Sequence, residues 1–120
     1  MTGTVDELGR ALLRITLRHP VAETESRLDA WIDTGFTGDL VVPRSQLRSM
    51  NLPLGPTARA VLADGSEIGL ETFTCLLQWF GEWRRIEVIA NEGQYPLLGV
   101  TLLQGHALHI DYRTGTISVD

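Results

Sequence analysis

A single carboxylate stands where an apolar run of the sequence gives way to a turn. Asp33 follows Trp31 and Ile32, and these apolar residues predict a buried strand that ends at the acid. The chain then continues through Gly35 and Gly38, which allow a tight turn and close backbone approach. A carboxylate at the rim of a core is costly unless it is hydrogen-bonded or used chemically. Asp33 is therefore the first candidate for general acid or base chemistry.

This stretch resembles the active-site motif of the retropepsin-like aspartic peptidases. The matching residues are Asp33-Thr34-Gly35, followed by Phe36-Thr37-Gly38, and a second element downstream, Pro96-Leu97-Leu98-Gly99. The order and spacing of the two elements fit the family, and the resemblance extends from Ile15 to Val119. It implies an all-β, mainly antiparallel fold with one or two short helices, in the form of the retropepsin-like barrel. The plainer alternative is that Asp33 only caps a turn.

The resemblance implies an aspartic endopeptidase that hydrolyses peptide bonds. Hydrolysis of an amide by carboxylates needs two acids, one to activate water and one to protonate the carbonyl oxygen. The chain has one Asp-Thr-Gly and is too short for two lobes, so a homodimer that contributes one Asp33 from each subunit is expected. Two carboxylates held about 3 Å apart, as is general for aspartic peptidases, share one proton because they cannot both ionise.

The resemblance also gives roles to the residues that follow Asp33. The active-site loop would consist of Thr34, Gly35, Phe36 and Thr37. The Thr34 hydroxyl would hydrogen-bond across the dimer axis, although an ordinary turn threonine is the alternative, and Gly35 would admit the substrate backbone. Phe36 is larger than the residue common in viral members, and we expect its ring to narrow the site or to fill its floor.

A hairpin is predicted where Asp64-Gly65 separates residues 57–63 from residues 67–77, and this dipeptide favours a type I′ turn. The hairpin lies where the family has its flap, which must open for an extended peptide and then close over it. Substrate contacts are expected from Ala63, Asp64, Gly65 and Ser66, and structural support of the site from Leu97, Leu98 and Gly99. A surface hairpin without this role is the alternative.

Many short strands separated by turns predict a closed β-fold, with one domain over residues 1–120. Residues 1–9 are polar and are expected to fray or to form a short helix. One or two helical turns are expected over residues 44–50. In the family the chain ends interleave at the dimer interface, and Ala11–Leu17 and Ile117–Val119 are the candidates here.

The composition indicates which kinds of partner and which cellular compartment to expect. A net charge of −5 disfavours nucleic acid and anionic membrane, and no apolar run approaches the roughly 18 residues of a membrane-spanning helix. The single cysteine, Cys75, suits a reducing cytoplasm and is expected to be an inert core thiol. No cofactor is predicted, and no metal, because His106 and His109 would point to opposite faces of a strand. The expected partners are a second copy and a peptide or protein substrate.

Other interpretations stay open at this level. A module of the same fold could bind peptides or scaffold a partner without catalysis, and a β-barrel carrier could use Asp33 to anchor a small molecule. Three aromatic residues, Trp79, Phe80 and Trp83, cluster around a predicted turn and either mark a contact surface or pack on the sheet. The oligomeric state and the behaviour of Asp33→Asn in a cleavage assay discriminate among these functions.

Overall fold

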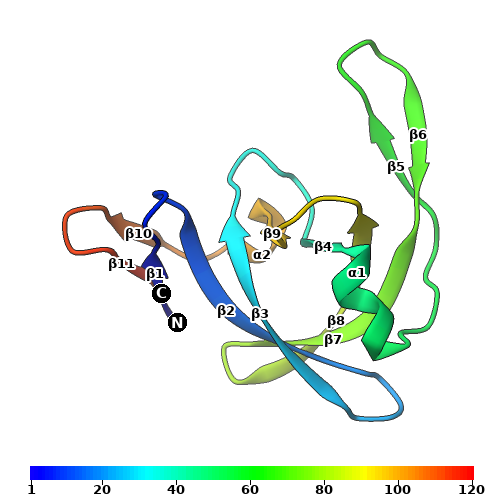
Figure 1. Ribbon diagram of the computed structural model, residues 1–120, viewed down its shortest axis with the longest axis horizontal. Helices are drawn as coiled ribbons and strands as arrows, with labels where there is room; N and C mark the ends of the chain where they lie inside the picture. Colours follow the sequence, from blue (N-terminus) through cyan, green and yellow to red (C-terminus); the bar gives the residue numbers. More distant parts are fainter.

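The computed structural model describes residues 1–120 and consists mainly of β-strands (Figure 1). The strands are β1 (Thr2–Val5), β2 (Ala11–Arg18), β3 (Glu25–Ile32), β4 (Leu40–Pro43), β5 (Ala58–Val61), β6 (Glu67–Leu70), β7 (Thr72–Trp79), β8 (Glu82–Asn91), β9 (Leu97–Leu98), β10 (Leu108–Asp111) and β11 (Thr116–Val119). The helices are α1 (Arg44–Leu47), which continues into a 3-10 turn at Arg48–Met50, and α2 (Val100–Leu103). Neither α1 nor α2 has the length and apolar character needed to cross a bilayer.

One pairing closes most of the main sheet into a barrel. The strand order is β10-β11-β1-β2-β3-β9-β4-β8-β7, and β2 also pairs with β7, where Leu17 lies opposite Leu77. Six strands, β2, β3, β9, β4, β8 and β7, therefore form a closed ring, and β1, β11 and β10 extend from it. Only the β3–β9 and β4–β8 pairs are parallel. The predicted fold class, a mainly antiparallel barrel with short helices, is confirmed.

Alternation of apolar and polar residues sets the inside of the barrel. In β2 every second residue is buried, as the period of two predicted, and β8 follows the same pattern in its second half. These strands contribute to a core of 21 buried residues, which also includes Leu47 of α1 and Leu102 of α2. The helical turns predicted over residues 44–50 are present as α1 and the 3-10 turn that follows it. The short helices thus cover the barrel with one buried leucine each.

The N-terminal segment differs from the expectation of a frayed end or a short helix over residues 1–9. Thr2–Val5 is a strand, β1, that lies between β11 and β2. The expectation was wrong because β11 supplies a hydrogen-bonding partner from the far end of the chain. The two segments expected to interleave between subunits, Ala11–Leu17 and Ile117–Val119, also have partner strands within the same chain.

The only cysteine lies inside the barrel. Cys75 is on β7, where its side chain is fully buried, and burial together with the negative charge of Glu87 raises the pKa of the thiol to about 12. A thiolate is the reactive species, so the native thiol should be inert at neutral pH. We expect a thiol-specific reagent to label Cys75 only after denaturation. Rapid stoichiometric labelling of the folded protein would contradict this.

Candidate active site

Asp33 is the first residue after β3 and lies half-buried at the rim of the barrel. Its backbone N–H donates to the carbonyl of Leu98 at 2.9 Å, which continues the parallel pairing of β3 with β9. Leu98 is also opposite Leu40 at the start of β4, the strand that follows the loop. The short strand β9 therefore lies between both ends of the Asp33 loop and fixes where the loop begins and ends.

The Asp33 carboxylate takes part in the turn with one oxygen. Oδ1 accepts a hydrogen bond from the Gly35 N–H at 2.9 Å, and the Asp33 carbonyl accepts one from the Phe36 N–H at 3.1 Å. No hydrogen bond from the chain reaches Oδ2. The turn-capping role considered from the sequence is thus real for Oδ1, and it holds the carboxylate in one orientation with Oδ2 available to another group.

The loop is attached to the start of α2 by two further hydrogen bonds. The Val100 N–H donates to the Phe36 carbonyl at 2.9 Å, and the Thr101 hydroxyl donates to the Thr37 carbonyl at 2.8 Å. Thr37 itself is exposed. These bonds connect the two sequence elements that carried the family resemblance, although they are more than 60 residues apart in the chain.

Glycine at position 99 is required by close backbone approach. A Cβ atom there would lie 2.1 Å from the Gly38 carbonyl oxygen and 2.6 Å from Cδ2 of Phe36. The Phe36 ring also lies against Gly38, where a Cβ would be 2.4 Å from Cζ. The ring therefore packs on the two glycines and supports the loop, and it is not among the residues that line the neighbouring pocket.

A shallow pocket of about 280 Å³ lies beside the acid. It is lined by Trp31, Ile32, Asp33, Thr34 and Leu97. Thr34 is exposed, and Leu97 is half-buried. The three apolar side chains could hold an apolar group of a ligand, while the carboxylate and the hydroxyl contact a neighbouring polar group of the same ligand.

A cation–π cluster stands behind Trp31. The Arg10 guanidinium lies 4.0 Å from the centre of the Tyr95 ring and 5.9 Å from that of Trp31, and the two rings meet edge to face. Asp6 holds Arg10 from the other side, with 2.7 Å between Oδ2 and Nε. Sequence reasoning did not assign Arg10 or Tyr95 a role, because the contact joins residues far apart in the chain. The cluster fixes one wall of the pocket.

The β5–β6 hairpin projects away from the barrel (Figure 1). Its tip holds the predicted residues Ala63, Asp64, Gly65 and Ser66, all of them exposed. The predicted type I′ turn is wrong, because only Gly65 has a positive φ, of 85°. The loop has three residues instead. The Gly65 N–H donates to the Leu62 carbonyl at 2.9 Å, and the Ser66 N–H donates to Asp64 Oδ1 at 2.8 Å.

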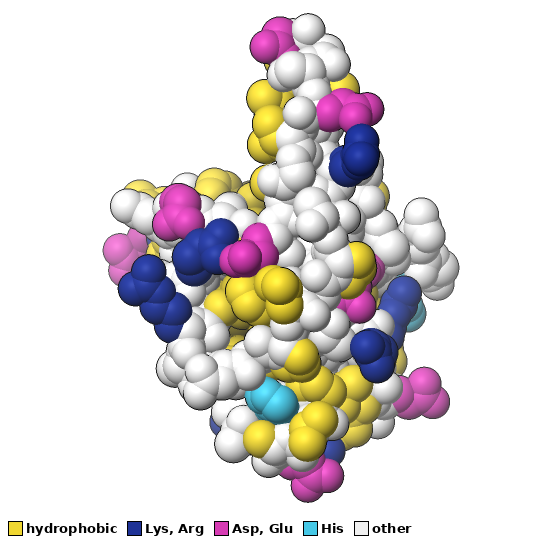
Figure 2. All heavy atoms as spheres, turned by 90° about the vertical axis from the view of Figure 1, so that its right-hand side faces the viewer, with side chains coloured by type: hydrophobic (Ala, Val, Ile, Leu, Met, Phe, Trp, Pro, Cys, Tyr) yellow, Lys and Arg dark blue, Asp and Glu magenta, His cyan; other side chains and the backbone are white.

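Apolar side chains are exposed on this hairpin. Val61, Leu62 and Ile68 are all open to solvent, and Figure 2 shows hydrophobic groups along the projection. Hydrogen bonds from the Ser66 hydroxyl and N–H lower the pKa of Asp64, so this carboxylate stays ionised above acidic pH. The hairpin therefore combines a closed tip with an apolar surface that has no partner within the chain.

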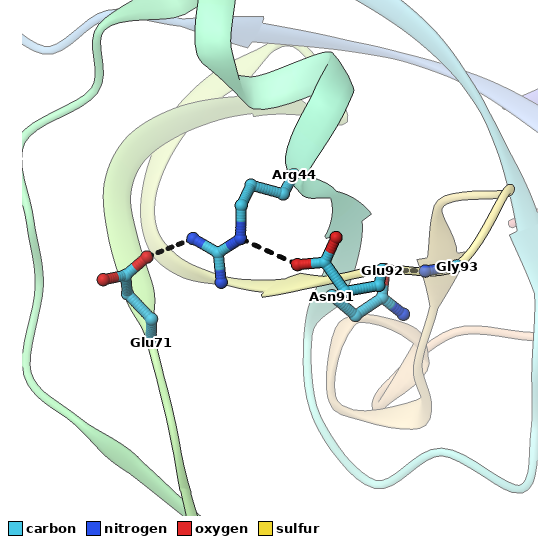
Figure 3. A network of polar contacts seen from close by, with 5 residues as sticks. All are labelled: Arg44, Glu71, Asn91, Glu92 and Gly93. Carbon is cyan, nitrogen blue, oxygen red and sulfur yellow. Dashed lines mark hydrogen bonds and ion pairs between the residues drawn. The ribbon is translucent and has the colours of Figure 1, made fainter.

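An ion-pair network joins the base of the hairpin to the loop between β8 and β9 (Figure 3). Arg44, the first residue of α1, contacts Glu71 between β6 and β7, and its Nε lies 2.9 Å from Glu92, just after β8. The Gly93 N–H donates to Asn91 Oδ1 at 3.2 Å in the same loop. Exposed ion pairs are individually weak, but here one guanidinium connects both segments.

A second acid of the loop, Asp39, lies where burial disfavours its ionised form. Asp39 Oδ1 is buried without a hydrogen-bond partner, and burial raises the pKa of this carboxyl, an effect that the charge of Arg84 opposes. A raised pKa in the folded state means that folding favours the protonated form of Asp39. The protonated acid therefore contributes its full stability below the ordinary pKa of an aspartic acid, and this contribution is lost as the pH rises through the raised pKa. We expect Asp39→Asn to increase the free energy of unfolding at neutral pH by about 0.5 kcal/mol, with no gain near pH 3. Denaturant unfolding at the two pH values measures this difference.

Comparison with solved structures identifies the fold. No family model matches the sequence, and no curated protein matches it either. A retropepsin-like aspartic protease from Rickettsia conorii is 13% identical, with a TM-score of 0.66 over 98% of this chain and 86% of that one. EIAV protease, solved with an inhibitor, is 14% identical, with a TM-score of 0.58 over 84% and 91%. The protease of simian foamy virus is 22% identical, with a TM-score of 0.51 over 77% and 90%. The chain has the retropepsin-like fold.

Proposed function

We propose that the protein is an aspartic endopeptidase that acts as a homodimer, with residues 1–120 as one retropepsin-like domain. The observation that carries this proposal is the Asp33 loop, which in a chain of this fold is held by Leu98 and by the start of α2. One chain supplies one such acid. A second copy, related by a two-fold axis beside Asp33, supplies the other acid that amide hydrolysis needs.

In this dimer the two Asp33 carboxylates share one proton and one water molecule. The ionised carboxylate removes a proton from the water, which attacks the carbonyl carbon, while the protonated carboxyl gives its proton to the carbonyl oxygen. The carboxyl that took the proton of the water then gives it to the leaving nitrogen, the C–N bond breaks, and a hydroxyl of the tetrahedral intermediate returns a proton to the other carboxylate, which restores the pair. Because the pair must hold one proton, hydrolysis should be fastest at acidic to near-neutral pH.

The residues around Asp33 would bind the substrate in an extended form. Thr34 is exposed beside the acid and would hydrogen-bond across the axis, and Gly35 would admit the peptide backbone. The β5–β6 hairpin would act as a flap whose exposed apolar side chains cover the bound peptide. The free, buried thiol of Cys75 fits a reducing compartment, and we place the enzyme in the cytoplasm.

The test compares the rate of peptide cleavage with the fraction of dimer at the same protein concentrations. The protein is incubated with an unfolded protein substrate between about pH 4 and pH 7, and its mass in solution is measured by sedimentation at the same concentrations. We expect the specific activity to fall on dilution in step with the loss of dimer. A dimer that never cleaves would favour the peptide-binding alternative, and undiminished specific activity of a monomer would exclude the shared-acid mechanism.

A further inference from the structure

A second pocket lies outside the Asp33 site, on the side of the molecule that carries α1. Its volume is about 340 Å³, and it is lined by residues of α1, of the segment that follows α1 and of the start of β7: Arg44, Leu47, Arg48, Asn51, Leu52 and Phe73. It shares no residue with the pocket beside Asp33. Figure 2 views this side of the molecule and shows hydrophobic side chains exposed below the projecting hairpin, with basic side chains on either side of them.

Hydrogen bonds hold the segment that forms one wall of this pocket, residues 51–54. The Asn51 carbonyl lies 3.1 Å from Nε2 of His19, which directly follows β2. The Pro53 carbonyl accepts a hydrogen bond from the Thr74 N–H of β7 at 2.8 Å. The segment is thus fixed to two parts of the barrel, and the pocket is a regular part of the fold.

The floor of the pocket is apolar. Leu47 and Leu52 are buried in the hydrophobic core, and the half-buried Phe73 packs against the same core. Leu54 pairs with Phe73 in an isolated bridge next to the pocket, and its side chain is 68% exposed. An apolar group bound on this floor is removed from water, and a second apolar group of the same ligand can pack on Leu54.

The rim of the pocket carries a guanidinium that has no counter-ion in the chain. Arg44 and Arg48 are one helical turn apart and so lie on the same side of α1 and the 3-10 turn. Glu71 and Glu92 both contact Arg44, whereas Arg48 is exposed and forms no ion pair. No aspartate or glutamate lines the pocket. Arg48 is therefore free to bind an anion through two parallel N–H groups, and the Asn51 side chain can donate a further hydrogen bond.

An apolar floor below a free guanidinium fits a ligand that carries a carboxylate next to an apolar group. Arginine and carboxylate form a planar pair with two hydrogen bonds. An inorganic anion would use Arg48 but would leave the apolar floor empty. The C-terminal residue of a peptide presents both features when its side chain is apolar, and the residue before it can reach the neighbouring Leu54.

We propose that this pocket binds the C-terminal carboxylate of a peptide whose last residue is apolar. Arg48 holds the carboxylate, the last side chain occupies the apolar floor, and the preceding residue packs on Leu54. The choice of a peptide rests on the proposed function, because each cleavage by an endopeptidase leaves a new C-terminal carboxylate. Arg44 also lines the pocket and contacts Glu71 at the base of the β5–β6 hairpin, so a bound product lies beside the proposed flap and apart from Asp33.

Calorimetry of three ligands with the wild-type protein tests this recognition. The ligands are N-acetyl-alanyl-alanyl-leucine, the same peptide with a C-terminal amide, and hexanoate. We expect the peptide acid to bind at least about tenfold more tightly than the amide, which has no charge for Arg48, and more tightly than hexanoate, which does not reach Leu54. Equal binding of the peptide acid and its amide would overturn the recognition of a carboxylate. Equal binding of hexanoate would overturn the choice of a peptide.

Substitutions of the free arginine locate the ligand. Arg48→Gln should weaken binding of the peptide acid at least about tenfold, and Arg48→Lys, which keeps the charge but not the planar pair, should weaken it less. Arg85→Gln on β8 is the matched control, because Arg85 is also exposed and forms no ion pair but lies outside the pocket. Thermal unfolding checks that the variants fold. Wild-type affinity in Arg48→Gln, or an equal loss in Arg85→Gln, would contradict the proposed site.

The outcomes separate this pocket from the proposed chemistry. Asp33→Asn should bind the peptide acid as the wild type does, and loss of binding in this variant would place the ligand at the Asp33 loop and overturn a separate site. Binding that depends on Arg48, in a protein that never hydrolyses peptides, would support the pocket and overturn the proposed function. Hydrolysis by a protein that does not prefer the peptide acid to its amide would overturn the pocket and leave the function standing.

Discussion

Asp33→Asn should abolish peptide hydrolysis and leave the fold unchanged. The homodimer carries the substitution twice, so both acids are lost, and neither amide can take a proton from water. We expect the rate to fall by more than about 10³-fold. The fold should persist because the amide oxygen of asparagine can still accept the hydrogen bond from Gly35. Initial rates of peptide cleavage and the thermal unfolding midpoint measure the two effects.

The control for this substitution is Asp29→Asn on the same strand. Asp29 is exposed and pairs with Arg14 on the outside of β3, so its loss should alter neither the rate nor the stability appreciably. If Asp33→Asn retained wild-type activity, the proposed chemistry would be wrong. If it unfolded the protein, Asp33 would be a structural acid whose turn-capping bond dominates.

Gly99→Ala should cause the largest loss of stability among the substitutions near the site. The added Cβ would meet the carbonyl oxygens of Gly38 at 2.1 Å and of Phe36 at 2.8 Å, and these backbone atoms cannot rotate away. We expect a loss of about 3 kcal/mol in the free energy of unfolding, measured with denaturant, because overpacking forces the backbone to shift. The shift would move the Asp33 loop, so the cleavage rate should fall as well.

Gly93→Ala provides the comparison for Gly99→Ala. A Cβ at position 93 would approach only the side chain of Asn91, at 3.2 Å, on an exposed loop. This substitution should change stability by no more than about 0.5 kcal/mol. Equal stabilities of the two alanine variants would show that the contact between the Asp33 loop and the start of α2 is looser than the structure has it.

Local patterns were sufficient to predict much of the fold. The alternation in β2, the apolar run into Asp33 and the helix formers after Pro43 each specify one element through near neighbours in the chain. The link between Asp33 and Leu97–Gly99 was predicted only by family resemblance, because no local rule pairs β3 with β9. The hydrogen bond from Asp33 to Leu98 gives that link its physical basis.

Features that depend on distant partners could not be predicted. Residues 2–5 form a strand because β11 is available more than 100 residues later, and nothing in their own composition requires it. Arg10 acquires its position from Tyr95 in the same way. The turn at Gly65 differs from the expected type because Asp64 accepts a hydrogen bond from the Ser66 N–H and the loop includes a third residue.

The dependence of activity on the fraction of wild-type chains tests the shared Asp33 pair most directly. Wild-type and Asp33→Asn chains are unfolded together, refolded in varying proportions at a fixed total concentration, and assayed for peptide cleavage. If hydrolysis needs one acid from each copy, only wild-type pairs are active, and an equal mixture retains about one quarter of the wild-type rate. Activity proportional to the wild-type fraction, with one half remaining in that mixture, would contradict a catalytic site shared between two chains.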